Sequence, residues 1–204
     1  AEQLLKEVRF DAIRGNISEI KTLASLCGTQ EKNSGNMAVS DTMDVGKITD
    51  KSDHCGKITG IDGSGRGVDA DNADTVTEEN LAQHISNAKM LSKKLQTIVA
   101  ITGAIDLVTD GSSCYVIRNG NPQMGHVTGA GCQLSGILTA FLAANPENKL
   151  QAAAAAVCMM GYAGELAAEK SGQSGSGTYR VSLMDAVSCM DGDILERGAR
   201  YEIR

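Results

Sequence analysis

Hydrophobic residues follow helical spacing in some stretches of the chain and form short strand-like runs in others. Spacing of three and four residues predicts helices over residues 2–8, 17–27, 77–95, 133–144, 149–170 and 179–190. Apolar runs rich in Ile and Val predict strands over residues 10–13, 97–101, 105–109 and 115–117, and one more that ends near Val127. Asp110-Gly111, between two of these strands, is typical of a hairpin turn. Strands interleaved with helices indicate an α/β layer structure built on one sheet.

Residues 28–66 interrupt this pattern. Gly, Ser, Asp, Asn and Lys dominate the segment, and its apolar residues occur singly. Connections of this length without elements of their own are unusual inside a compact domain. We therefore expect a single domain over residues 1–204 that carries a flexible insertion at 28–66. Because the first helix has no capping residue before it, the pattern also predicts that an N-terminal part of the domain is absent.

The stretch Val127-Thr128-Gly129-Ala130-Gly131-Cys132 leads directly into the helix predicted over 133–144. Backbone N–H groups at a helix start are unpaired, and the positive end of the helix dipole lies behind them. A glycine turn at this position can therefore cradle a phosphate, with Ala130 and Gly131 forming the cradle. The same field favours the thiolate of Cys132. The alternative is an ordinary glycine turn followed by a buried cysteine, and these six residues alone do not decide between the two.

Composition and charge narrow the classes of function. The chain has 204 residues and a net charge of −6, which argues against nucleic acid as a main partner. No apolar run reaches the ~20 residues that a membrane span needs, and no basic segment followed by an apolar one predicts a secretion signal. The six cysteines are scattered without a CxxC pair, which is typical of reduced thiols. We therefore expect a cytoplasmic protein with neither a membrane nor a nucleic-acid partner.

Several motifs together resemble one enzyme family. Residues 12–19, 67–69, 100–103, 127–132 and 175–179 occur in the order found in hydroxyethylthiazole kinase, a member of the ribokinase-like superfamily. The run Gly-Ala-Gly-Cys is a telling feature, since most members of the superfamily have Gly-Ala-Gly-Asp there. The resemblance favours the phosphate cradle over the ordinary turn. It implies a ribokinase-like α/β sheet with flanking helices, N-terminally incomplete because the first strands of the family have no counterpart in this chain.

The resemblance implies ATP-dependent phosphorylation of the alcohol of 4-methyl-5-(2-hydroxyethyl)thiazole in thiamine biosynthesis or salvage, with Mg²⁺ as cofactor. It assigns Arg14 and Thr102 to ATP, and Gly129 to the thiazole. It assigns Cys132 to the position of the catalytic base. Phosphoryl transfer depends on positioning and charge stabilisation, which a guanidinium and a helix N-terminus supply. A thiolate near the alcohol could accept its proton during attack.

Asn16 and Glu19 match the Asn-x-x-Glu of the superfamily, which implies that they hold Mg²⁺ through water. The same spacing also describes a capping box at the start of the helix over 17–27, so Glu19 has a purely structural alternative. Structural alternatives exist for the ATP residues as well. Arg14 could form a surface salt bridge, and Thr102 could cap a strand end.

Two other functions stay open. One is a catalytically inactive fragment that binds nucleotide or pairs with a complete paralogue, and the absent N-terminal strands favour it. The other is a different ribokinase-like activity on a small molecule, which Cys132 argues against. The resemblance further implies a homotrimer for the complete enzyme, with a small thiazole alcohol as its partner.

Overall fold

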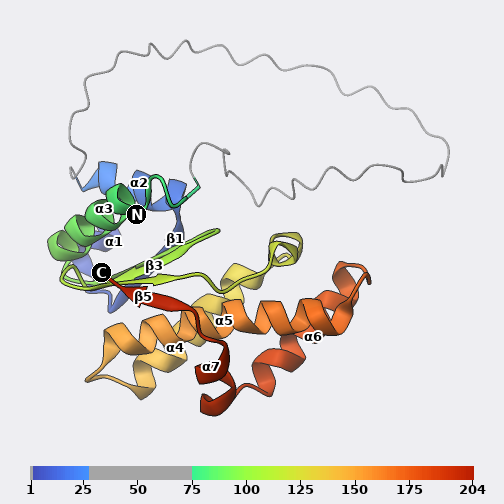
Figure 1. Cartoon of the computed structure of the whole chain (residues 1–204). Coiled ribbons are helices and arrows are strands. Elements are labelled where there is room, and N and C mark those ends of the chain that lie inside the picture. The colour runs from blue at the N-terminus through green and yellow to red at the C-terminus, as the bar shows by residue number, and fades with distance from the viewer. Residues whose placement is uncertain (1, 28–74) are drawn as a thin grey trace, which may run out of the picture. The chain divides into compact units, whose positions relative to one another are not determined.

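The computed structural model describes residues 2–27 and 75–204, and these form one five-stranded sheet with helices on both faces (Figure 1). The order of the strands is β1-β2-β3-β4-β5. The α/β class and the single sheet predicted from the hydrophobic pattern are therefore confirmed. The predicted insertion at 28–66 lies outside the described residues.

Helices and strands follow one another largely as the spacing of apolar residues predicts. The helices are α1 (Glu2–Glu7), α2 (Ile17–Leu26), α3 (Leu81–Leu95), α4 (Ala130–Ala144), α5 (Lys149–Ser171), α6 (Ser176–Ser188) and α7 (Gly192–Gly198), with a 3-10 helix η2 (Pro122–His126) before α4. The strands are β1 (Ala12–Asn16), β2 (Ile98–Thr102), β3 (Asp106–Thr109), β4 (Cys114–Ile117) and β5 (Tyr201–Ile203).

The strand directions bring several strand ends to the same edge of the sheet. Strands β1 and β2 run parallel, in register from Ala12 opposite Ile98 to Asn16 opposite Thr102. The other neighbouring pairs are antiparallel. Consequently β1, β2 and β4 all end at the edge where β3 begins. Side chains at these ends meet at this edge, which is where open α/β sheets generally bind their ligands.

Helices cover both faces of the sheet, and successive side chains of β2 point alternately into the two hydrophobic cores beneath them. Val99 and Ile101 pack into one core, together with residues of α2 and α3. Ile98 and Ala100 pack into the other core, together with residues of α4, α5 and α6. Figure 1 shows these two groups of helices on opposite sides of the strands.

Helix α5 lies at the centre of the second core, where its small residues let neighbouring segments approach closely. A Cβ on Gly161 would stand 2.6 Å from the carbonyl oxygen of Asn119, and one on Gly164 would stand 2.4 Å from Sδ of Met124. These two glycines therefore allow η2 and the segment after β4 to pack directly against the helix. Within the part of the chain that the structure describes, α5 is the one helix long and apolar enough to cross a membrane. Most of it is buried, as in the core helix of a globular domain.

Two boundaries near the cavity differ from those that the pattern predicts. The pattern predicts a strand that ends at Ile13, but β1 continues to Asn16 because it pairs with β2 along its whole length. The helix predicted from Thr77 begins at Leu81 instead. A turn precedes it, in which the N–H of Thr77 donates to the side chain of Asn80 at 2.7 Å.

The prediction of a strand that ends near Val127 is wrong, because the 3-10 helix η2 occupies this segment. Pro122 stands at the start of η2, where its fixed φ favours a helix and its missing N–H is not needed. The side chain of Asn121 caps the same end by accepting the N–H of Gln123 at 3.0 Å.

The C-terminal part of the chain holds more regular structure than the pattern predicts. Helix α6 begins at Ser176 rather than Tyr179, and α7 and β5 are not predicted at all. In β5, Tyr201 and Ile203 are both exposed although the strand pairs with β4. A strand of three residues without a buried side leaves little hydrophobic pattern to detect.

Replacing Gly161 with Ala should destabilise the protein by about 1–3 kcal/mol, because the added methyl would overlap the backbone of Asn119. Gly136 in α4 is the matched control, since a Cβ there meets nothing within 4 Å. Gly136→Ala should stabilise the protein by about 0.5–1 kcal/mol through helix propensity. Urea unfolding of the two variants and the parent measures both effects. Equal effects of the two substitutions would contradict the close packing of α5.

Candidate functional site

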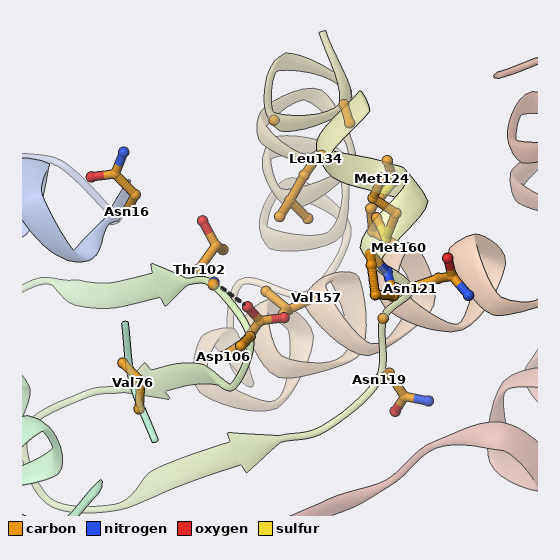
Figure 2. A pocket seen from close by; sticks show the side chains of 18 of the residues that line it. Asn16, Val76, Thr102, Asp106, Asn119, Asn121, Met124, Leu134, Val157 and Met160 are labelled. Carbon is orange, nitrogen blue, oxygen red and sulfur yellow. Dashed lines mark hydrogen bonds between the residues drawn. The ribbon is translucent and has the colours of Figure 1, made fainter. Parts of the chain in front are cut away.

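A cavity of about 680 Å³ opens at the edge of the sheet where β1, β2 and β4 end. Figure 2 shows Thr102 and Asp106 at the strand ends, with Met124 and Met160 on the helical side of the cavity. The wall is therefore mixed, with charge near the strands and apolar side chains near the helices. Its charged residues are Arg14, Asp106 and Arg118, and its apolar residues include Ile17, Val76, Met124, Leu134, Val157 and Met160.

Arg14 extends from β1 to the N-terminal end of α4. A Cβ on Gly131 would be 3.0 Å from Nη1 and 3.2 Å from Nη2 of Arg14, so glycine at this position lets the guanidinium approach the start of the helix. The Nε of Arg14 is buried and has no hydrogen-bond partner within residues 2–27 and 75–204. A guanidinium beside the positive end of a helix dipole forms a cationic site that attracts an anion.

Helix α4 begins as the glycine stretch predicts, with Gly129 as N-cap and Cys132 in the first turn. Gly129 has a φ of 94°, a left-handed conformation that favours glycine. Ala130 and Gly131 line the cavity, as expected of the predicted cradle. Gly129 and Cys132 do not line it, and Cys132 is exposed. The assignments of Gly129 to the thiazole and of Cys132 to the base therefore stay predictions.

Asn16 and Glu19 form a reciprocal capping box at the start of α2, which confirms the structural interpretation of this pair. The N–H of Glu19 donates to Oδ1 of Asn16 at 2.8 Å, and the N–H of Asn16 donates to Oε2 of Glu19 at 2.7 Å. Asn16 lines the cavity, whereas Glu19 does not.

The side chains of this capping box could bind a magnesium ion only through water molecules. Among the residues with described coordinates, no group of three Asp, Glu, His or Cys side chains converges on a possible metal position. Mg²⁺ usually keeps several waters and binds substrate phosphates, so it does not require an all-protein cage. The side-chain oxygens of Asn16 and Glu19 that accept these N–H groups keep further acceptor capacity, so their chemistry would suit an ion held through water, and this assignment stays a prediction.

Thr102 ends β2 at the cavity, where it is partly buried. Its hydroxyl lies 3.5 Å from the carbonyl oxygen of Gly15 on the neighbouring strand. In the turn that follows, the N–H of Gly103 donates to Oδ1 of Asp106 at 2.8 Å, as the dashed line in Figure 2 marks. This bond fixes the short turn between β2 and β3 against the cavity.

Asp106 is not among the residues that the sequence motifs single out. It opens β3, is 9% exposed and lines the cavity. Burial raises the pKa of Asp106 from 3.8 to about 7, although the N–H of Gly103 and the charge of Arg14 favour the carboxylate. The sequence did offer one signal, since Asp106 stands between the apolar residues Ile105 and Leu107. An Asp in a buried strand usually has a specific partner or role.

Arg118 follows β4 and is also absent from the sequence motifs. Its Nε donates to Oε1 of Glu78 at 2.9 Å, and its Nη2 donates to Oε1 of Glu202 at 2.8 Å. These bonds raise the pKa of Arg118 above its ordinary value and lower the pKa of both carboxyls. Two carboxylates therefore balance the charge of Arg118, which weakens its attraction for an anion in the cavity.

Glu165 of α5 fixes the part of the wall that follows Arg118. Its Oε1 accepts from Nδ2 of Asn119 at 3.1 Å and from the N–H of Gly120 at 2.8 Å, and Arg200 donates to both carboxylate oxygens at 2.8 Å. Burial alone would raise the pKa of Glu165, but the bonds from Arg200, Gly120 and Asn119 outweigh it, so the pKa is lowered. A charged network thus holds this wall to α5.

The predicted site residues that meet at the cavity come from distant parts of the sequence. They are brought together because β1 and β2 are parallel neighbours whose ends face the start of α4. The predicted site residues that line the cavity are Arg14, Asn16, Thr102, Ala130 and Gly131.

Comparison with known proteins gives a consistent family signal. The model of the family described as "Hydroxyethylthiazole kinase family" matches residues 32–193. A protein of Clostridium acetobutylicum named hydroxyethylthiazole kinase is 41% identical over 203 residues, covering 99% of this chain and 62% of that protein. A protein of Desulfovibrio desulfuricans with the same name is 33% identical over 211 residues, covering 99% of this chain and 61% of that protein. The chain thus spans less than two thirds of the length of these relatives.

A solved structure gives the same signal at the level of the fold. It is described as that of a hydroxyethylthiazole kinase protein from Pyrococcus horikoshii OT3. It matches with a TM-score of 0.56 and 28% sequence identity, covering 62% of this chain and 48% of that one. The predicted fold class is thereby supported by a known three-dimensional relative.

Asp106→Asn should stabilise the protein at about pH 8 but have little effect at about pH 4. The pKa of Asp106 is higher in the folded protein than in the unfolded chain, so the stabilisation from its bound proton is lost as the pH rises from about 4 through about 7. A pKa difference of about three, at ~1.4 kcal/mol for each unit, sets a limit of ~4 kcal/mol. Asn stays neutral and keeps an acceptor for Gly103, so it avoids this loss.

Urea unfolding of the parent and of Asp106→Asn across this pH range measures the difference in the free energy of unfolding. A difference that does not change with pH would contradict the raised pKa of Asp106.

Proposed function

Because this chain belongs to the hydroxyethylthiazole kinase family, we propose that it carries the nucleotide site of a kinase that phosphorylates the alcohol of 4-methyl-5-(2-hydroxyethyl)thiazole. The phosphate donor is ATP, the cofactor is Mg²⁺, and the reaction serves thiamine biosynthesis. The names of the relatives support the substrate class, and the cavity supports the nucleotide half of the site. The homotrimer that the sequence resemblance implies stays a prediction.

The packing of Arg14 against Gly131 is the observation that carries this proposal. It brings a fixed positive charge to the first turn of α4 inside a cavity that also contains Thr102. Phosphoryl transfer requires little covalent chemistry from the protein, so positioning and charge stabilisation account for most of the catalysis. Arg14 and the N–H groups at the start of α4 would bind the β- and γ-phosphates, and Thr102 would contact the nucleotide.

Gly129 and Cys132 would serve the acceptor alcohol. They belong to the same turn as Gly131, so an alcohol placed against this turn lies next to the transferring phosphate. The thiolate of Cys132 would accept the proton of the alcohol while the alcohol oxygen attacks the γ-phosphorus of ATP. The bond between the γ-phosphorus and the leaving ADP oxygen then breaks. The exposure of Cys132 leaves it accessible to a substrate that covers this turn.

Asn16, which lines the cavity, and its capping partner Glu19 would hold Mg²⁺ through water. When bound, the ion neutralises charge on the phosphate oxygens. The protein's own part is the orientation of the two side chains, which the capping box fixes at the start of α2.

We expect ATP- and Mg²⁺-dependent phosphorylation of the thiazole alcohol, and Cys132→Ala should reduce its turnover by about 10²–10⁴-fold, the usual contribution of general base catalysis. The Kd for ATP should stay nearly unchanged. Cys189→Ala is the matched control, because Cys189 is also exposed but lies at the end of α6. Coupled ADP release measures turnover.

Two outcomes of this assay would be adverse. Turnover of Cys132→Ala at the parent rate would contradict the assignment of the base. ATP binding without any phosphorylation would instead favour an inactive nucleotide-binding chain over the proposed kinase.

Arg14→Ala should weaken ATP binding by about 1.5–3 kcal/mol, the usual value for a lost charged hydrogen bond. Binding of the thiazole alcohol should barely change, because Arg14 faces the phosphate cradle. Arg180→Ala is the matched control, since Arg180 is an exposed residue of α6. Calorimetric titration gives both affinities. An unchanged Kd for ATP in Arg14→Ala would remove Arg14 from the proposed phosphate site.

A further inference from the structure

Asp106 and Arg14 carry opposite charges on the wall of the same cavity. We propose that Asp106 is a positioning residue of the phosphate site, which balances the charge of Arg14 in the free protein and takes up a proton when an anionic phosphate binds to Arg14. The inference rests on the proposed function, because it concerns the residue that would bind the phosphates of ATP. It adds a proton-coupled step that phosphate contacts alone do not imply.

The geometry keeps the Asp106 carboxyl group in place. The side chain is 9% exposed at the start of β3, and the N–H of Gly103 donates to Oδ1 at 2.8 Å. The turn that carries Gly103 directly follows Thr102, the other residue assigned to ATP. Asp106 therefore connects both parts of the nucleotide site, through a hydrogen bond on one side and through charge on the other.

Few other charges among the described residues act on this carboxyl group. Arg14 on β1 favours its ionised form, whereas burial favours the neutral form. Cys158 on α5 also faces it, but burial raises the pKa of that thiol to about 12, so the thiol stays neutral at physiological pH. The cavity residues from α4 and η2 are uncharged, and Arg118, after β4, is already paired with Glu78 and Glu202.

Binding of an anion changes this balance. A phosphate on the guanidinium of Arg14 neutralises the charge that stabilises the carboxylate, and it brings further negative charge into the cavity. The carboxylate of Asp106 then binds a proton from solvent and becomes a neutral carboxylic acid, with no other bond formed or broken. Because linkage is reciprocal, phosphate should bind more tightly when Asp106 is already protonated.

A purely structural role for Asp106 predicts a different behaviour. If the side chain only held the turn through Gly103, phosphate binding would leave its protonation unchanged. Asp106→Asn separates the two roles, because an amide oxygen can still accept the N–H of Gly103 but cannot titrate. Asp193→Asn is the matched control, since Asp193 is an exposed residue of α7.

The experiment is calorimetric titration of the chain with inorganic tripolyphosphate and with MgATP, between about pH 6 and pH 8. Each titration is run in two buffers of different ionisation enthalpy, so that the number of protons taken up is measured directly. The parent and Asp193→Asn should take up more protons on binding near neutral pH than Asp106→Asn does, with each ligand. At about pH 8, Asp106→Asn should bind about 5-fold or more tightly than the parent, and near pH 6 the two should converge.

The outcomes separate this inference from the proposed function. Equal proton uptake by the parent and Asp106→Asn, with both ligands bound, would overturn the inference and leave the nucleotide site intact. Proton-linked binding of tripolyphosphate without binding of MgATP would support the inference but contradict the proposed kinase. Failure of the parent to bind either ligand would overturn both.

Discussion

The close approach of the Arg14 guanidinium to the first turn of α4 is the contact on which the cavity depends. It brings a positive side chain next to the positive end of a helix dipole, an arrangement that is unfavourable by itself. Two features make it tolerable: Gly131 has no side chain to keep the groups apart, and the buried carboxyl group of Asp106 supplies opposite charge. The free protein therefore already holds a guanidinium beside the start of α4. Such a site is prepared for an anion before any ligand arrives.

The remainder of the fold keeps this contact in place. Parallel pairing of β1 with β2 places Asn16 opposite Thr102 and Arg14 opposite Ala100, so the register sets both strand ends at one edge. Helix α5 supports the opposite wall in two ways. It lets Asn119 pack directly against Gly161, and it offers the carboxylate of Glu165 to the backbone beyond Asn119. Ion pairs and close backbone packing thus fix the position of this wall, while hydrophobic burial holds the helices against the sheet.

Much of the fold and part of the site could be predicted from sequence, for identifiable reasons. Helices α4 and α5 have long apolar patterns, and the capping box at Asn16 is a local motif, so neither needs tertiary information. The position of Asp106 does, because its burial depends on the turn that joins β2 to β3 and on the charge of Arg14. The same holds for η2 and β5, which lack the hydrophobic periodicity that sequence analysis detects. Helix η2 depends on the capped start at Pro122, and β5 depends on its pairing with β4.

Strand β1 gives the site a further property, because among the described strands it is an edge strand that pairs with β2 alone. Edge elements open locally at a lower free energy than the whole domain unfolds. Each such opening carries Arg14 away from α4 and removes the site. A ligand that binds only the closed form must therefore slow amide hydrogen exchange in β1 as it binds. Ligand binding in the cavity and the pairing of β1 with β2 are consequently coupled, so the exchange rates of the β1 amides report on ligand binding.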